Sequence, residues 1–196
     1  MFMSDFKIIM SVVVVALTFI GYAPYIRDVI KNKTTPHSFT WLVWSFATGI
    51  TFALQISGGA GLGALATLSA TIICFSIFIL GVIKKNKDIV YLDFVFLGFS
   101  FVALFLWVVV KQPVFSIILI VLVDVLGFLP TVRKSWKNPH SETLFSYKLN
   151  VIRQILTIFA LQQYSILTWL SPAVWAIVNL LFSIMLIIRR KIIKNN

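Results

Sequence analysis

Charged residues are scarce in this chain of 196 residues, at 12%, and the acidic ones number 6 against 17 Lys and Arg. A soluble globular domain has about 25% charged and about 45–50% apolar residues, whereas 60% of this sequence is apolar or aromatic. These proportions exclude a soluble domain, a disordered chain and a collagen-like repeat. The sequence therefore predicts an integral membrane protein that has the lipid bilayer as a partner.

Cysteine and the common catalytic motifs are also nearly absent. The single cysteine, Cys74, permits no intrachain disulfide and no cysteine-based metal cluster. No His-Glu-x-x-His, Gly-x-Ser-x-Gly or Gly-x-Gly-Asp run occurs, so we expect no enzyme, no catalytic residue and no cofactor. The two histidines, His37 and His140, each stand between Pro and Ser. This setting favours loop capping over pH sensing, and no metal site is predicted.

Seven apolar stretches are each long enough to cross about 30 Å of hydrocarbon as an α-helix. They cover residues 8–26, 39–56, 62–83, 89–110, 113–132, 143–161 and 168–188. No clear small-x-small cleavage site follows the first stretch, so we interpret it as a membrane helix of the mature protein rather than a signal peptide. No stretch alternates with a period of two. The predicted fold is therefore an all-α membrane protein with seven transmembrane helices.

The basic residues predict how the helices are oriented. Lys and Arg gather after the first, third, fifth and seventh stretches, whereas the opposite side holds only Lys7 and Lys111. By the positive-inside rule the N-terminus is expected outside and the C-terminus in the cytoplasm. This orientation accounts for the net charge of +11, so no nucleic-acid partner is expected. Small size and the lack of a targeting signal favour a multi-pass protein of a bacterial inner membrane.

An internal repeat indicates how the seven helices are organised. The segment 21–27 (GYAPYIR) reappears as 127–133 (GFLPTVR), with Gly, Pro and Arg at the same spacing. Each copy continues to a Pro-His-Ser sequence, and further matches follow at similar offsets. We predict a first triple-helix bundle (1–87), a linker transmembrane helix (88–111) and a second triple-helix bundle (112–196). The linker makes the two bundles parallel, a plan known in transporters that bind substrate near the midplane.

The doubled Gly-x-x-Pro turn, the basic loops and this 3+1+3 layout resemble the PQ-loop/SWEET transporter superfamily over nearly the whole chain. The Gln of the Pro-Gln signature is replaced by Tyr25 and Thr131, so both motifs are degenerate. The resemblance implies a SWEET-like fold. It also implies a protein that moves sugars, amino acids or vitamins, or one that acts as a cargo receptor. The two motif prolines, Pro24 and Pro130, weaken their helices, so they are candidate hinges of a cytoplasmic gate, or they simply end the helices.

The sixth stretch carries an unusual density of polar residues for a membrane span. Helical spacing places Asn150, Arg153 and Gln154 on one face, which we expect to look into a cavity. Arg153 lies near midplane, where its guanidinium suits a carboxylate or phosphate. The alternative is that Asp124 or backbone carbonyls neutralise it.

The seventh stretch adds Asn179 and Trp175 to the predicted binding site, and the second stretch adds Thr48. The resemblance to SWEET transporters implies an intramembrane Asn in the last helix of each bundle, one that holds sugar hydroxyls. The counterpart of Asn179 in the first bundle is Ile72, which weakens the prediction of a neutral sugar site. We therefore expect a site that leans toward the second bundle.

Asp124 and Lys148 both lie about 9 Å from the cytoplasmic end of their helices, counted at 1.5 Å per residue. They are predicted to form a structural ion pair, or Asp124 is a proton site whose charge Arg153 senses. The expected function is a transporter that moves a small polar solute (a sugar, amino acid or small organic anion) by alternating access between the bundles. The alternative is a non-transporting receptor or scaffold. One chain contains both bundles and suffices for transport, although a homo-oligomer is compatible with it.

Overall fold

The computed structural model describes residues 2–32, 36, 38–84 and 91–193. These residues form helices and no β-strand, which confirms the all-α prediction. The α-helices are α1 (Phe2–Ile30), α2 (Ser38–Ser57), α3 (Leu65–Ile83), α4 (Tyr91–Val108), α5 (Pro113–Lys137), α6 (Leu144–Ala160) and α7 (Ile166–Ile192). Two short 3-10 helices accompany them, η1 (Gly61–Ala64) before α3 and η2 (Pro139–Ser141) between α5 and α6.

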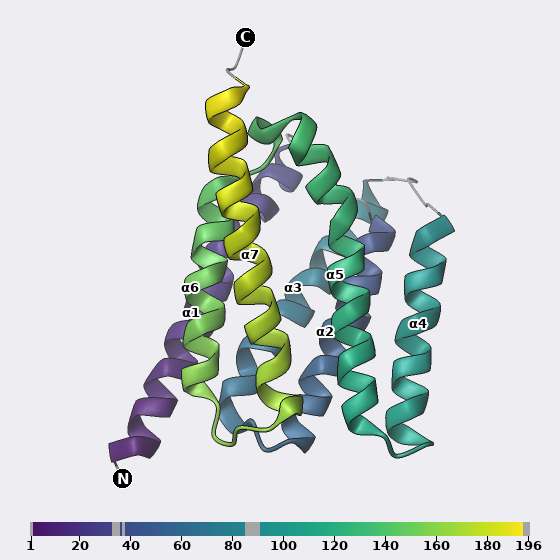
Figure 1. Ribbon diagram of the computed structural model, residues 1–196, viewed down its shortest axis with the longest axis vertical. Helices are drawn as coiled ribbons and strands as arrows, with labels where there is room; N and C mark the ends of the chain where they lie inside the picture. Colours follow the sequence, from purple (N-terminus) through teal and green to yellow (C-terminus); the bar gives the residue numbers. More distant parts are fainter. Residues whose placement is uncertain (1, 33–35, 37, 85–90, 194–196) are drawn as a thin grey trace.

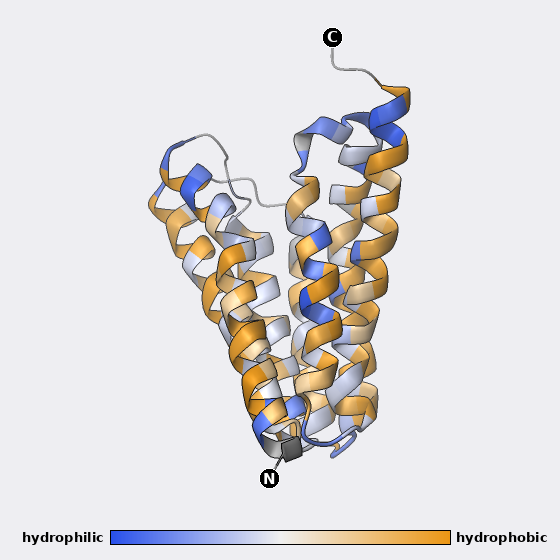
Figure 2. Cartoon of the chain, turned by 90° about the vertical axis from the view of Figure 1, so that its left-hand side faces the viewer, coloured by the Kyte–Doolittle hydropathy of each residue, from blue (hydrophilic) through white to orange (hydrophobic). Residues whose placement is uncertain are grey.

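Five helical segments are long and apolar enough to cross a membrane. They are Asp5–Ile30, Ser38–Ser57, Gly61–Ile83, Pro113–Lys137 and Ile166–Ile192. The apolar segment Phe94–Val108 of α4 is shorter, and α6 has 17 residues and carries two charged side chains. Apolar residues occur along every helix (Figure 2), and many large apolar side chains are exposed. The chain is therefore compatible with a multi-pass membrane protein, and seven spanning helices remain a prediction.

Successive helices run in opposite directions along one common axis (Figure 1). One end of the bundle, here called the turn end, holds the start of α1 and the connections at residues 58–64, 109–112 and 161–165. The other end, here called the basic end, holds the end of α7 and most of the basic side chains. Because α1 and α5 both run from the turn end to the basic end, the trios α1–α3 and α5–α7 have the same orientation.

The helix packing has the same plan in both trios. Helix α3 packs against α1 and α2, as α7 packs against α5 and α6. Between the trios, α1 packs against α6, and α2 packs against α5. Helix α4 lies at the side of the bundle, against α5 and α2 (Figure 1). This packing agrees with the predicted boundaries of two three-helix units and a linker, which nonetheless remain a prediction.

The repeated glycines lie at the two equivalent contacts between the trios. A Cβ added to Gly21 on α1 would lie 3.7 Å from the Leu149 side chain on α6. A Cβ added to Gly127 on α5 would lie 3.2 Å from the Trp44 indole nitrogen on α2. The glycine of each Gly-x-x-Pro segment thus brings its own helix close to the middle helix of the opposite trio. The repeat in the sequence and the contacts in space correspond at these positions.

Candidate functional site

The two trios are joined at the turn end by hydrogen bonds that cross between them. The backbone N–H groups of Gln162 and Gln163 donate to the carbonyls of Ala60 and Gly59, each at 3.1 Å. The connection before α3 and the connection before α7 therefore pair with each other. The left-handed backbone at Gly59, with φ of 83°, is one that glycine adopts without strain.

Side chains strengthen the same junction. The buried Gln55 amide on α2 donates to the carbonyl of Thr168 on α7 at 3.2 Å. Lys7 on α1 donates to the carbonyl of Gln162 at 3.1 Å. Gly63 lies so close to the end of α6 that an added Cβ would be 2.8 Å from the carbonyl oxygen of Ala160. Backbone and side chains together therefore close the turn end across the two trios.

At the basic end the long basic side chains bind inside their own trio. Lys84 at the end of α3 donates to the carbonyl of Val29 at the end of α1, at 2.6 Å. Arg189 on α7 donates to the carbonyl of Trp136 at 2.9 Å and lies over its ring. Arg190 donates to the carbonyl of Pro139 at 3.0 Å. Viewed from the side, the helices are close together at the turn end and diverge toward the basic end (Figure 2).

Arg153 is buried between α6 and α1, at 6% exposure. Its Nε donates to Oδ1 of Asn150 at 3.1 Å, and one terminal nitrogen donates to the buried Thr18 hydroxyl on α1 at 3.3 Å. Within the described residues no carboxylate lies within 4.0 Å of its guanidinium. Asp124 therefore does not neutralise Arg153 by direct contact, and the cation is held by neutral oxygens. The predicted polar face of α6 does bring Asn150 and Arg153 together.

Asp124 on α5 is buried as well, at 2% exposure, and its Oδ1 has no hydrogen-bond partner in the part of the chain that the structure describes. One helical turn after Asp124, the Trp44 indole nitrogen lies against Gly127, and that N–H is also without a partner. Trp44 and Trp175 both pack on the apolar cluster around Phe128. Indole rings from both trios thus pack on Phe128, which follows Asp124 by one turn of α5.

Asn179 lies one turn after Trp175 on α7 and is 2% exposed. Its amide donates to the Trp175 carbonyl at 2.7 Å, while its Oδ1 has no partner. A buried polar atom without a hydrogen bond costs free energy, so this oxygen is a candidate contact for a ligand. Asn179 and Trp175, both predicted as binding residues, are thus joined by a hydrogen bond within α7, and their role in binding remains a prediction.

Two further side chains lie close to this region. Tyr22, one helical turn after Thr18 on α1, packs against the apolar cluster that contains Cys74 of α3, as does Trp44. Neither was predicted as a site residue, although Tyr22 belongs to the repeated Gly-x-x-Pro segment. The name central polar cluster is used here for six buried or half-buried residues of α1, α2, α5, α6 and α7, namely Tyr22, Trp44, Asp124, Arg153, Trp175 and Asn179.

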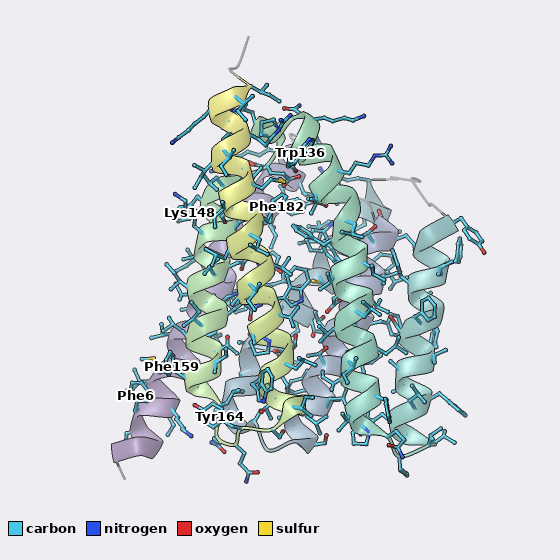
Figure 3. All side chains as sticks on the ribbon, in the orientation of Figure 1. Phe6, Trp136, Lys148, Phe159, Tyr164 and Phe182 are labelled. Atoms are coloured by element: carbon cyan, nitrogen blue, oxygen red, sulfur yellow. The ribbon has the colours of Figure 1, made fainter. Side chains whose placement is uncertain are left out.

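The other predicted residues do not belong to this cluster. Lys148 is exposed on the outer edge of the bundle (Figure 3), so the ion pair expected between Asp124 and Lys148 does not form. The physical reason is that equal depth does not place two side chains on facing sides of their helices. Thr48 bonds inside the first trio, accepting from Thr71 at 3.1 Å and donating to the Trp44 carbonyl at 2.7 Å. Gln154 is half-buried on α6.

The structure describes the side chain of one of the two motif prolines, Pro24, but not that of Pro130. Pro24 lies inside α1, which continues beyond it to Ile30, so this proline does not end its helix. A hinge at Pro24 therefore remains a prediction. Position 130 lies within α5, and the Pro130 side chain lies outside the described residues. His37 also lies outside them, whereas His140 is exposed in η2, 3.3 Å from the carbonyl of Ile193.

Two surface hollows lie away from the central polar cluster. One is lined by Trp107, Lys111 and Pro113 near the connection between α4 and α5. The other follows the outer side of α1 from Phe19 to Lys31. Neither is lined by a predicted binding residue.

The candidate site is therefore a set of buried polar groups between two helical trios. Its charges have no ion-pair partner within the described part of the chain. Comparison of the chain with protein-family models, curated proteins and solved structures finds no match.

Proposed function

We propose that this protein is a membrane transporter that moves a small polar solute by alternating access between the trios α1–α3 and α5–α7. The observation that carries the proposal is that Asp124 and Arg153 are buried at the junction of the trios and have no ion-pair partner among the described residues. An ionisable group inside a membrane span costs several kcal/mol and is typically functional. A solute bound at these groups would compensate the free-energy cost of their burial.

The unequal ends of the molecule support the same proposal. Hydrogen bonds cross between the trios at the turn end, whereas the long basic side chains of the basic end bind within one trio. By the positive-inside rule the basic end faces the cytoplasm, with the N-terminus outside and the C-terminus inside. In this proposal the conformation is closed toward the outside. Transport requires the pairing of residues 59–60 with 162–163 to break and re-form.

We also propose that the chain is a PQ-loop/SWEET-type protein with seven spanning helices. The equivalent contacts of Gly21 and Gly127 with the opposite trio support a duplicated three-helix unit joined by α4. A bacterial inner membrane is the proposed location. Both trios come from one chain, so one copy forms the proposed site, and a homo-oligomer is compatible with it.

The proposal is tested by solute uptake into proteoliposomes that contain the purified full chain. Labelled glucose, alanine and lactate represent the three solute classes. We expect uptake of at least one of them, and loss of that uptake in Arg153→Gln and Asp124→Asn. Arg133→Gln is the matched control, because Arg133 is exposed at the basic end. Uptake that is the same in the wild type, in all variants and in empty liposomes contradicts transport.

A non-transporting receptor or scaffold is the second candidate function. The observation that favours it is the packing of Arg153, whose guanidinium already bonds to Asn150 and Thr18. A scaffold would need such bonds only for stability. In that case Arg153→Gln lowers stability, while no solute crosses the membrane.

A further inference from the structure

A shallow hollow follows the outer side of α1 toward the basic end. Its volume is about 410 Å³, within the range of about 300–1,000 Å³ that ligand sites occupy. Within the described part of the chain it is lined by Phe19, Ala23, Ile26, Arg27, Ile30 and Lys31. These residues recur at helical spacing, so they form one stripe along α1. The stripe begins with apolar side chains and adds two cations near the end of the helix.

This stripe faces away from the rest of the bundle. Phe19 is 50% exposed and Ile30 is 59% exposed, while other sides of α1 pack against α3 and α6. Ala23 is exposed as well and has no side-chain atom beyond Cβ. It therefore leaves a gap between the larger side chains of Phe19 and Ile26. In a membrane protein an exposed apolar gap of this kind is open to the acyl chain of a lipid.

The length of the hollow matches one leaflet of a bilayer. From Phe19 to Lys31 a helix rises about 18 Å at 1.5 Å per residue, and half of the hydrocarbon core measures about 15 Å. The apolar part then lies in the hydrocarbon, and the two cations lie at the level of the headgroups. In the proposed orientation this is the cytoplasmic leaflet, whose anionic lipids attract Lys and Arg.

The two cations of the hollow can share one anionic group. Arg27 and Lys31 are one helical turn apart on the same face of α1. Arg27 contacts Asp28 at 3.0 Å, but its side chain is 61% exposed, and exposed ion pairs contribute little. The Lys31 side chain is exposed and has neither a hydrogen bond nor an ion pair among the described residues. With two cations and one carboxylate, this end of the hollow is positively charged.

The end of α1 does not repel an anion as a bare helix C-terminus does. Lys84 of α3 donates to the carbonyls of Val29 at 2.6 Å and Ile30 at 3.1 Å. Such terminal carbonyls carry the negative end of the helix dipole, and the Lys84 ammonium group offsets it. At the end of α7, by contrast, Arg190 is itself bound to the carbonyl of Pro139. The two cations of the hollow are thus available to an anionic group.

We propose that this hollow binds an anionic glycerophospholipid, with one acyl chain along Phe19, Ala23 and Ile26 and the phosphate at Arg27 and Lys31. The inference goes beyond the proposed transport function and does not depend on it. The acyl chain fills the gap at Ala23, and the phosphate compensates the two cations. A zwitterionic lipid with the same chains offers the first contribution, but its own cation opposes the second.

The test is thermal unfolding of the purified full chain in dodecyl maltoside, because a ligand that binds the folded state raises the melting temperature. The probe is dioleoyl phosphatidylglycerol. Dioleoyl phosphatidylcholine has the same chains without the net charge, and inorganic phosphate has the charge without chains. We expect phosphatidylglycerol to raise the melting temperature most, phosphatidylcholine to raise it less, and inorganic phosphate to leave it unchanged.

A double variant tests the two cations. Arg27→Gln with Lys31→Gln should weaken the apparent affinity for phosphatidylglycerol by about fivefold for each cation lost. Arg133→Gln with Lys137→Gln is the matched control. These residues have the same types and spacing at the end of α5, and they are exposed but do not line the hollow. The control should keep the wild-type affinity.

A second pair of variants tests the gap. Ala23→Phe fills it and leaves both cations in place, so the affinity for phosphatidylglycerol should fall. Because Ala23 is exposed, the melting temperature without lipid should not change. Gly98→Phe on α4 is the control, since Gly98 has no atom within 4 Å of an added Cβ. It adds the same ring elsewhere on the surface and should keep the wild-type affinity.

Equal stabilisation by the two lipids overturns the proposal, as does equal stabilisation by inorganic phosphate and phosphatidylglycerol. An equal loss of affinity in the control with Arg133 and Lys137 replaced would show an attraction spread over the whole basic end, and it also overturns the site. Unchanged affinity in Ala23→Phe contradicts the placement of the acyl chain. Absence of solute uptake in proteoliposomes refutes transport alone and leaves the lipid site intact.

Discussion

The close packing of Gly63 against α6 gives a prediction whose size follows from the structure. In Gly63→Ala the new Cβ would lie 2.8 Å from the carbonyl oxygen of Ala160 and 3.0 Å from Cα of Leu161. Both contacts are with backbone, so no side-chain rotation relieves them. Overpacking of this kind costs about 1–3 kcal/mol, and the better helix propensity of Ala returns at most about 1 kcal/mol. We expect a net loss of about 1–2 kcal/mol, or about 5–30-fold in the folded-to-unfolded ratio.

The assay is unfolding of the purified protein in mixed micelles, compared between Gly63→Ala and Gly98→Ala. Gly98 on α4 has no atom within 4 Å of an added Cβ, so the same change there is expected to be neutral or slightly stabilising. The two substitutions are chemically identical, and only Gly63→Ala should lower the unfolding midpoint. Equal shifts, or a Gly63→Ala protein more stable than the wild type, would refute the close packing of η1 on α6.

Three further predictions concern the turn end and the charges of α6. The variant Ala60→Cys with Gln162→Cys should form a disulfide on mild oxidation, because their backbone hydrogen bond brings these positions close together. That disulfide should stop uptake reversibly in proteoliposomes; uptake that persists would show that the turn end need not open. Thr18→Val should cost about 1–3 kcal/mol in thermal unfolding, because Arg153 loses a buried acceptor. Lys148→Met should change stability by less than about 0.5 kcal/mol, since Lys148 is exposed; a loss as large as that of Thr18→Val would reveal a partner.

The positions of the helices could be predicted from hydropathy, as could both ends of α2 and α6 to within one residue, but the end of α5 could not. The apolar stretch 113–132 located α5, but this helix continues to Lys137. The stretch 143–161 located α6, which spans Leu144–Ala160. Hydropathy measures where apolar side chains stop, whereas a helix ends where its backbone hydrogen bonds stop. The two coincide only where a turn follows directly, as at the end of α6.

In the candidate site, contacts between residues of the same helix could be predicted from their spacing, whereas contacts between different helices could not. The spacing of Asn150 and Arg153 correctly placed both side chains together. The ion pair between Asp124 and Lys148 was inferred from depth alone, and depth does not fix which way a side chain points around its helix axis. Thr18, which accepts a hydrogen bond from Arg153, lies 135 positions away from it in the sequence. Contacts at that separation depend on how the helices dock, for which the sequence carries no local signal.

The pairing of the two turns has a consequence for how the molecule is assembled during synthesis. The carbonyls of Gly59 and Ala60 receive their donors from Gln163 and Gln162, which the ribosome adds about a hundred residues later. Until then, these carbonyls of the newly made first segment have only water to bind. We therefore expect the early helices to reach their final arrangement only after the last helix has entered the bilayer. The packing of the first trio would then be completed only when the C-terminal half of the chain is in place.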